Sequence, residues 1–173
     1  MNSDPISILQ TAADLAAKAH VGQTIRFSDI PYIAHPVRVS MAVSCLFGCV
    51  DPEVAAAALL HDTLEKTGLT ADEIRNALGP RVLHLVLALT KEEGGDRTEY
   101  WKCLRDEVWE ARLIKMADAL DHLDCPADEL ARRIKGAKRA LELAHSEEEP
   151  IRDARRILDE AVVLAAIRLG ASI

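Results

Sequence analysis

The residues best able to do chemistry are His61 and Asp62, which stand side by side at the end of an apolar segment, residues 55–60. A buried carboxylate without a partner costs free energy, and a bound divalent cation would remove that cost. Two further residues with ligand-forming side chains lie far away in the chain, His35 in PYIAHP and Asp118 in LIKMADALDHL. Because manganese, iron and zinc accept imidazole and carboxylate ligands, the four residues predict a metal site.

Each of these residues has a simpler interpretation when it is taken alone. A lone buried histidine is usually a core residue with a satisfied hydrogen bond, and a lone aspartate within a helix is usually a cap or an ion-pair partner. Glu65 changes the balance, because it follows His61 by four residues and would share its face of a helix. A carboxylate one turn from a metal ligand can act as a base. The set therefore favours a catalytic metal centre.

The order His35, then His61 and Asp62, then Asp118 resembles the HD superfamily of metal-dependent phosphohydrolases. The local strings HVGQ, PYIAHP, AALLHDTLEKT, LTK and IKMAD carry the resemblance. Within that superfamily the chain is most similar to the hydrolase domain of RelA/SpoT proteins and to small alarmone hydrolases of the metazoan SpoT homologue type. The likeness runs from about residue 12 to about residue 124. The HD pair alone would be a weak signal, whereas the combination of strings is specific.

The resemblance implies a compact all-α fold of several helices and one bound manganese ion. Its ligands would be His35, His61, Asp62 and Asp118, and this mixed set would also accept iron. It further implies an enzyme that removes the 3′-diphosphate of guanosine tetraphosphate or pentaphosphate. Glu65, acting with Asp62, matches the family acid that orients or deprotonates the attacking water.

Four departures from the family strings fall on groups that, in the family, contact the nucleotide or polarise water. One is the stretch before Pro31, where only Arg26 remains of the usual basic pair. Lys66 stands in place of the second acid of HDxxED, and the family string ADRLHN reads ADALDH here. Ala119 thus replaces a basic residue and His122 replaces the asparagine, while Cys125 stands where a threonine is frequent. None of these changes touches the metal ligands. We therefore expect them to alter substrate choice or rate rather than metal binding.

Two alternatives remain open beside alarmone hydrolysis. The first is an HD phosphohydrolase of another nucleotide, such as a phosphorylated dinucleotide or a nucleoside monophosphate. The second is a metal- and nucleotide-binding module that has lost turnover through Lys66 and His122. In each case the ligand is a small-molecule nucleotide, and we expect the residues that contact it to include Arg26, Lys66, Lys115 and His122.

Composition sets limits on the class of protein. The 173 residues suit a single domain, 1–173, and hydrophobic residues at 49% with only 3% aromatics suit close helix packing. A net charge of −7 argues against a general nucleic-acid binder, although a few local cations can still dominate the field in a pocket.

The sequence also bears on location. No apolar run is long enough to span a bilayer and the first residues lack a signal-peptide pattern, so we expect a cytoplasmic protein. The sequence leaves the oligomeric state open.

The elements that must position these residues are helices almost throughout. Cap signals and apolar periodicity predict helices at about 5–20, 36–47, 52–65, 70–79, 81–91 and 98–118, followed by two amphipathic helices after Pro126. Residues 92–96 read as a loop. His20 is expected to brace the loop that follows the first helix, and both tryptophans are expected to pack in the core or between helices.

Overall fold

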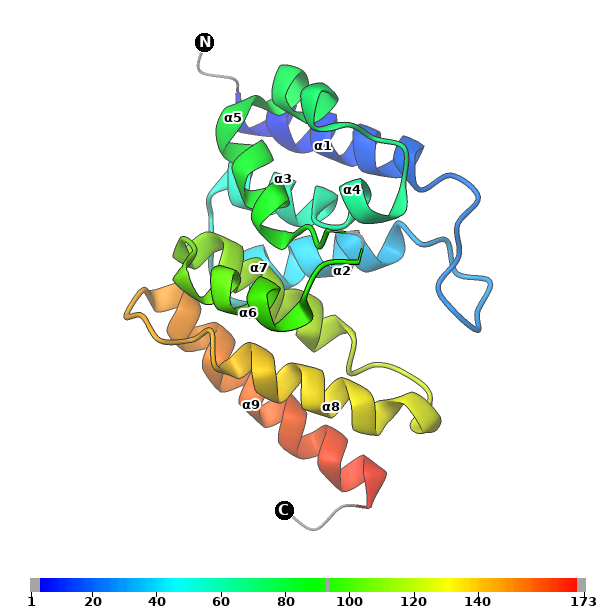
Figure 1. The fold of residues 1–173 in the computed structure, drawn as a ribbon, viewed down its shortest axis with the longest axis vertical. Helices are drawn as coiled ribbons and strands as arrows, with labels where there is room; N and C mark the ends of the chain where they lie inside the picture. The colour runs from blue at the N-terminus through cyan, green and yellow to red at the C-terminus, as the bar shows by residue number, and fades with distance from the viewer. Residues whose placement is uncertain (1–3, 93, 171–173) are drawn as a thin grey trace.

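The fold is a bundle of helices, which Figure 1 shows in a computed structural model that describes residues 4–92 and 94–170. Within these residues the one extended pairing is an isolated bridge between Thr24 and Pro31, so the expected all-α class is confirmed. The helices are α1 (Pro5–Ala19), α2 (Ala34–Met41), the π-helical η1 (Ala42–Leu46), α3 (Pro52–Leu60), α4 (Thr63–Lys66), α5 (Ala71–Leu89), α6 (Arg97–Asp106), α7 (Trp109–Asp121), α8 (Ala127–Leu141) and α9 (Glu149–Leu169).

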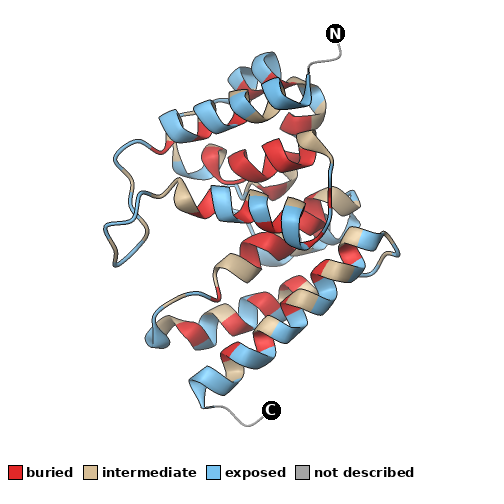
Figure 2. Ribbon diagram, turned by 180° about the vertical axis from the view of Figure 1, so that it is seen from behind, coloured by how far each residue is buried: buried red, intermediate tan, exposed pale blue. Residues whose placement is uncertain are grey.

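Helix α3 lies at the centre of the bundle because it is apolar on every side. Each residue from 54 to 60 is buried, and the helix packs against α1, α2, α5 and α7. Figure 2 shows the buried residues concentrated on these central helices. Helix α7 is the next most enclosed, with a buried run from 111 to 114. Helix α3, which ends next to His61, and helix α7, which carries Asp118, are therefore deeply buried parts of the fold.

Several helix boundaries follow the signals in the sequence. The Asp51 side chain accepts a hydrogen bond of 2.9 Å from the backbone N–H of Glu53 at the start of α3. Thr70 and Glu73 form the predicted capping box of α5. Gly79 interrupts that helix with a φ of 86°, a value that glycine adopts readily, so the two predicted segments meet at a kink.

Two helices that we expected to be continuous are broken, and in both places side chains take over backbone hydrogen bonds. The helix through His61 ends at Leu60, where the His61 ring and the Thr63 hydroxyl bond to the carbonyls of Ala58 and Leu60. The helix from residue 98 to 118 is broken at residues 107 and 108. There the Glu107 carboxylate accepts the N–H of Val108.

Helices α8 and α9 form a pair that packs on α7. They are the two amphipathic helices expected after Pro126, and α8 buries one apolar stripe while it keeps a strongly charged opposite face. Across residues 4–92 and 94–170, none of the helices combines the length and the apolar character that a membrane span needs. The charged face of α8 turns toward the site described next.

Candidate metal centre

Three residues from three helices converge at the candidate site. His35 lies in the first turn of α2, His61 caps the C-terminus of α3, and Asp118 lies in the last turns of α7. Their ligand atoms lie within 4.8 Å of one another, and all three residues are buried. The Asp118 Oδ1 atom is 3.3 Å from His35 Nε2 and 3.7 Å from His61 Nε2. The fold thus assembles a compact set of two imidazoles and one carboxylate.

The orientation of these side chains suits a bound cation. The Nδ1 atom of His61 lies 2.9 Å from the Ala58 carbonyl, which can only accept, so Nδ1 donates and Nε2 keeps its lone pair. In the described part of the chain, Nε2 of His35 is buried without a hydrogen-bond partner. Asp118 uses Oδ2 to bind Lys115 Nζ at 2.7 Å, which leaves Oδ1 facing the two rings. Three electron-pair donors therefore point to one place, as a divalent metal requires, and the His122 ring also approaches Asp118 Oδ1, with its Nε2 at 3.4 Å.

Asp62, the fourth expected ligand, lies beside this set rather than within it. Its Oδ2 atom is 3.9 Å from His61 Nε2 and accepts hydrogen bonds from the Tyr32 hydroxyl at 2.5 Å and from Lys66 Nζ at 2.7 Å. Lys66 also donates to the Tyr32 oxygen. The Asp62 Oδ1 atom is buried, 3.3 Å from His20 Nε2, without hydrogen-bond geometry. An ammonium group thus competes directly for one of the expected ligands.

His20 occupies the bracing position that the sequence suggested. Its Nδ1 atom lies 2.9 Å from Gln23 Oε1, and the Gln23 amide in turn donates to the backbone carbonyl of Lys66 at 2.9 Å. These bonds connect the loop after α1 to the helix that carries Glu65.

The electrostatics of the site favour ionised carboxylates and bound positive charge. Burial would raise the pKa of Asp118, but Lys115 and His122 outweigh it and hold that pKa well below its usual range. Burial would lower the pKa of His35, yet the adjacent Asp118 and Asp121 carboxylates raise it to about 9. Burial lowers the pKa of His122 to about 4, so that ring is neutral at pH 7. An environment that attracts positive charge to His35 also suits a cation.

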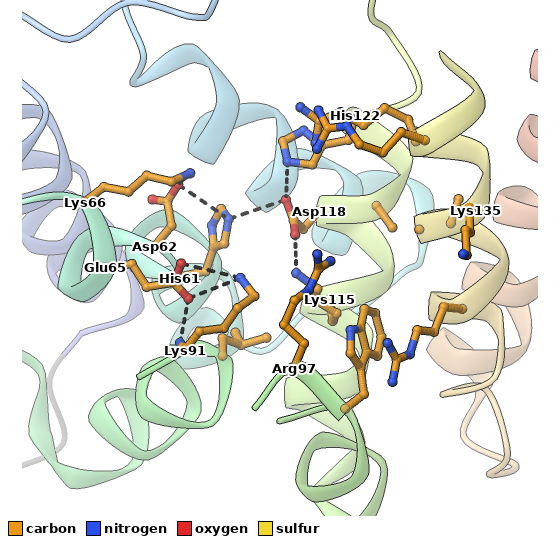
Figure 3. Close-up of a pocket in the computed structure, with 18 residues that line it drawn as sticks. His61, Asp62, Glu65, Lys66, Lys91, Arg97, Lys115, Asp118, His122 and Lys135 are labelled. Atoms are coloured by element: carbon orange, nitrogen blue, oxygen red, sulfur yellow. Dashed lines mark hydrogen bonds and ion pairs between the residues drawn. The ribbon is translucent and has the colours of Figure 1, made fainter. Parts of the chain in front are cut away.

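A cavity of about 660 Å³ opens from these residues toward α8 (Figure 3). His61, Asp62 and Glu65 line one wall, and α8 lines the opposite wall. The chain is acidic overall, but the lining is rich in cations. They are Lys66, Lys91, Arg97, Lys115, Arg132, Arg133, Lys135 and Arg139. A polyanionic ligand would therefore meet a locally positive surface next to the candidate metal ligands.

Comparison with known proteins agrees with this geometry. A family model described as the HD domain matches residues 12–161. The chain belongs to this family. It is 34% identical over 128 residues to the guanosine-3′,5′-bis(diphosphate) 3′-pyrophosphohydrolase MESH1 of Homo sapiens, with 71% of each chain covered. It is also 41% identical over 127 residues to the bifunctional (p)ppGpp synthase/hydrolase SpoT of Escherichia coli, covering 66% of this chain and 17% of that protein.

The same likeness extends to three dimensions. A solved structure of a metazoan orthologue of SpoT that hydrolyses ppGpp matches this HD domain with a TM-score of 0.76 at 25% identity. The match covers 91% of this chain and 95% of that structure. The predicted resemblance to HD domains of the RelA/SpoT hydrolase type is therefore confirmed.

The structure of this HD domain brings most of the expected site residues to the cavity. Glu65 lines it although the helix is broken after Leu60, and its carboxylate accepts the backbone N–H of Lys91 at 2.6 Å. Lys66, Lys115 and His122 line it as well. Arg26 does not belong to the described lining. Its guanidinium is mostly exposed and pairs with Glu129 at 3.0 Å, so the expectation that it contacts substrate is not supported.

Sequence reasoning missed the contribution of α8. Its arginines have the pattern of the solvated face of an amphipathic helix, and no local motif connects Arg132 to Asp62, 70 positions earlier. It also assigned Trp101 to core or inter-helix packing alone. The ring packs on the core but lines the cavity too, with the Arg139 guanidinium 4.8 Å from its centroid. Tyr32, three residues before His35 in the same string, was a missed neighbour that its position could have indicated.

Proposed function

We propose that this HD domain is a manganese-dependent hydrolase that removes the 3′-diphosphate of guanosine tetraphosphate or pentaphosphate. The observation that carries the proposal is the convergence of three buried donor residues on a cavity lined by cations. The relatives that share its family and fold are named for this reaction, which supports the same substrate class here. Iron is the alternative metal, because a mixed imidazole and carboxylate set accepts either ion.

His35, His61 and Asp118, with Asp62 beside them, are the residues that would hold the ion. When bound, a divalent ion lowers the pKa of a water molecule and polarises a phosphoryl oxygen. The chain itself supplies the base. Glu65 stands on the cavity wall with its Oε1 atom fixed by the Lys91 backbone, and its Oε2 atom has only a long contact of 3.4 Å to Lys91 Nζ. That carboxylate can therefore orient a water molecule and take its proton.

The cations around the cavity would neutralise the phosphates of the substrate. Lys115 lies next to the metal ligands, since it binds Asp118 directly, and its ammonium is 5.8 Å from the centre of the Trp101 ring. The arginines of α8 face it from the other wall. A substrate with charged groups at both ends would be bound between the two walls.

One observation favours slower turnover than the family pattern implies. Lys66 Nζ binds the Asp62 carboxylate at 2.7 Å, where the family string has an acid. This contact supports, as a second candidate, a metal- and nucleotide-binding module with little hydrolysis.

An assay of phosphate and pyrophosphate release with Mn²⁺ would distinguish the candidates. The panel should contain guanosine tetraphosphate, a phosphorylated dinucleotide and a nucleoside monophosphate. Pyrophosphate from the alarmone supports the proposal, and release from another nucleotide alone would replace it.

Lys66→Asp is expected to raise alarmone hydrolysis by roughly tenfold, because a hydrogen bond to a charged group contributes about 1.5–3 kcal/mol and its loss frees Asp62. Adding His122→Asn, which restores the family asparagine beside Asp118, should raise the rate further. Lys66→Met is the matched control, since it removes the ammonium without adding an acid. Initial rates on guanosine tetraphosphate test this. A fall in both the single and the double variant would mean that Lys66 serves the native substrate.

Arg133→Met is expected to raise KM for guanosine tetraphosphate about tenfold or more while kcat changes little, the pattern of lost uniform binding. The Arg133 side chain lines the cavity, and its Nε atom is buried without a hydrogen-bond partner in the described structure. Arg156→Met removes an equal charge from the exposed side of α9 and is the control. Equal KM values in the parent and Arg133→Met would remove α8 from substrate binding.

A further inference from the structure

Asp121, one turn after Asp118 on α7, makes contacts that the proposed reaction does not use. Its Oδ2 atom lies 2.7 Å from His35 Nδ1. The Arg38 guanidinium donates to both carboxylate oxygens, from Nε to Oδ1 at 2.5 Å and from Nη2 to Oδ2 at 2.9 Å. Arg38 follows His35 by one turn of α2, so a single ion pair connects α2 to α7 directly behind the imidazole ring.

The direction of these hydrogen bonds determines which nitrogen of His35 can bind a metal. The Arg38 guanidinium can only donate, and the ionised Asp121 carboxylate can only accept. His35 Nδ1 must therefore carry a proton, and its remaining lone pair belongs to Nε2. That atom points away from Asp121 and lies 3.3 Å from Asp118 Oδ1 in the candidate site.

A second metal site at the same residues is the competing interpretation. Ligand atoms of His35, Asp121 and His122 also lie within 4.8 Å of one another. However, both Asp121 oxygens already accept from Arg38, and a second cation would lie beside that guanidinium. The His122 ring stacks on His35, with centroids 4.8 Å apart and planes only 6° apart, and so confines the ring instead. The contacts are those of an orienting shell around one metal.

We propose that Asp121, held by Arg38, is a positioning residue that fixes the tautomer and orientation of His35 for metal binding. This inference rests on the proposed role of His35 as a ligand. Loss of such an orienting carboxylate typically weakens metal affinity 10–100-fold, about the effect expected for Asp121→Ala. Arg38→Met should weaken affinity less, because it leaves the bond between Asp121 and His35 in place.

The experiment is a titration of the metal-free protein with Mn²⁺ in the absence of any nucleotide. Asp121→Ala should bind Mn²⁺ more weakly than the parent, and Asp121→Asn, which retains an acceptor oxygen, should recover part of the affinity. Asp124→Asn is the matched control, since it removes an equal charge three residues away from an exposed position. Circular dichroism and thermal unfolding of each variant show whether the fold is intact.

A second measurement is the NMR spectrum of the ¹⁵N-labelled parent loaded with Zn²⁺. The signal of the proton on His35 Nδ1 should be observed there, and it should be lost or shifted in Asp121→Ala.

The outcomes separate this inference from the proposed function. Parent-like Mn²⁺ affinity in folded Asp121→Ala, or equal weakening in Asp124→Asn, overturns the positioning role while alarmone hydrolysis still stands. Two Mn²⁺ ions per parent chain would assign Asp121 to a second metal site and overturn it too. Weakened affinity in Asp121→Ala alone supports it, whether or not guanosine tetraphosphate is the substrate. A parent that binds no Mn²⁺ overturns both the inference and the proposed ligands.

Discussion

Asp118→Ala is expected to leave the protein with almost no bound metal and to lower hydrolysis by at least about three orders of magnitude, because the ion contributes several kcal/mol to catalysis. Among the described residues, Asp118 is the one carboxylate with an oxygen atom within 4 Å of both His35 and His61. The parent should carry about one manganese or iron per chain, since one such set holds one ion. Elemental analysis of the purified proteins, combined with pyrophosphate release, measures both effects.

A second variant keeps this prediction testable if Asp118→Ala fails to fold. Removal of that carboxylate leaves Lys115 buried without its partner, which costs stability. His61→Ala removes a ligand without that cost and should lose the metal as well. Asp159→Ala, at an exposed position of α9, should retain parent metal content and rate. If folded Asp118→Ala and His61→Ala both bind metal as the parent does, the ligand set is wrong.

Glu65→Gln is expected to cut hydrolysis by roughly two or more orders of magnitude while metal content stays at the parent level, the range for loss of a positioned general base. The amide can still accept the hydrogen bond from the Lys91 backbone, so the local structure should survive. It cannot take a proton from water. Metal analysis and single-turnover rates, taken on the same preparations, separate the two effects.

The control for Glu65 is Glu92→Gln, an identical chemical change at an exposed residue of the adjacent loop. Its rate should match the parent. A parent-like rate in Glu65→Gln would remove the residue from the mechanism, and loss of metal in that variant would make it a ligand instead of a base.

The local features of the fold could be predicted because each depends on a few neighbouring residues. The capping box at Thr70, the proline that follows Asp51 and the kink at Gly79 are all encoded within four or five positions. The central place of α3 follows from its apolar composition on every side. The ligand types were also predictable from neighbouring residues. His61 and Asp62 end an apolar segment, and a buried carboxylate there needs a positively charged partner such as a metal ion.

The helix breaks and the side-chain contacts around the site could not be predicted in this way. They depend on how particular side chains pack in the folded chain, which local sequence patterns do not reveal. The helix break at His61 arises because a ring and a hydroxyl satisfy carbonyls that the backbone would otherwise bond. The bond from Arg38 to Asp121 joins residues 83 positions apart. The exchange of an acid for Lys66 is visible in the family string, but its bond to the Asp62 carboxylate is visible only in the fold.

The two walls of the cavity come from separate stretches of the chain, and this has a consequence for how such proteins diversify. The strings that mark the family end near residue 124, before α8 begins at Ala127. Under the proposed function, changes in α8 would therefore alter which nucleotide is bound without disturbing the proposed metal ligands. Homologues with the same metal strings can consequently differ in substrate, and a search by those strings alone would group them together. The positions of the arginines in α8 are the feature by which homologues with different substrates should be distinguished.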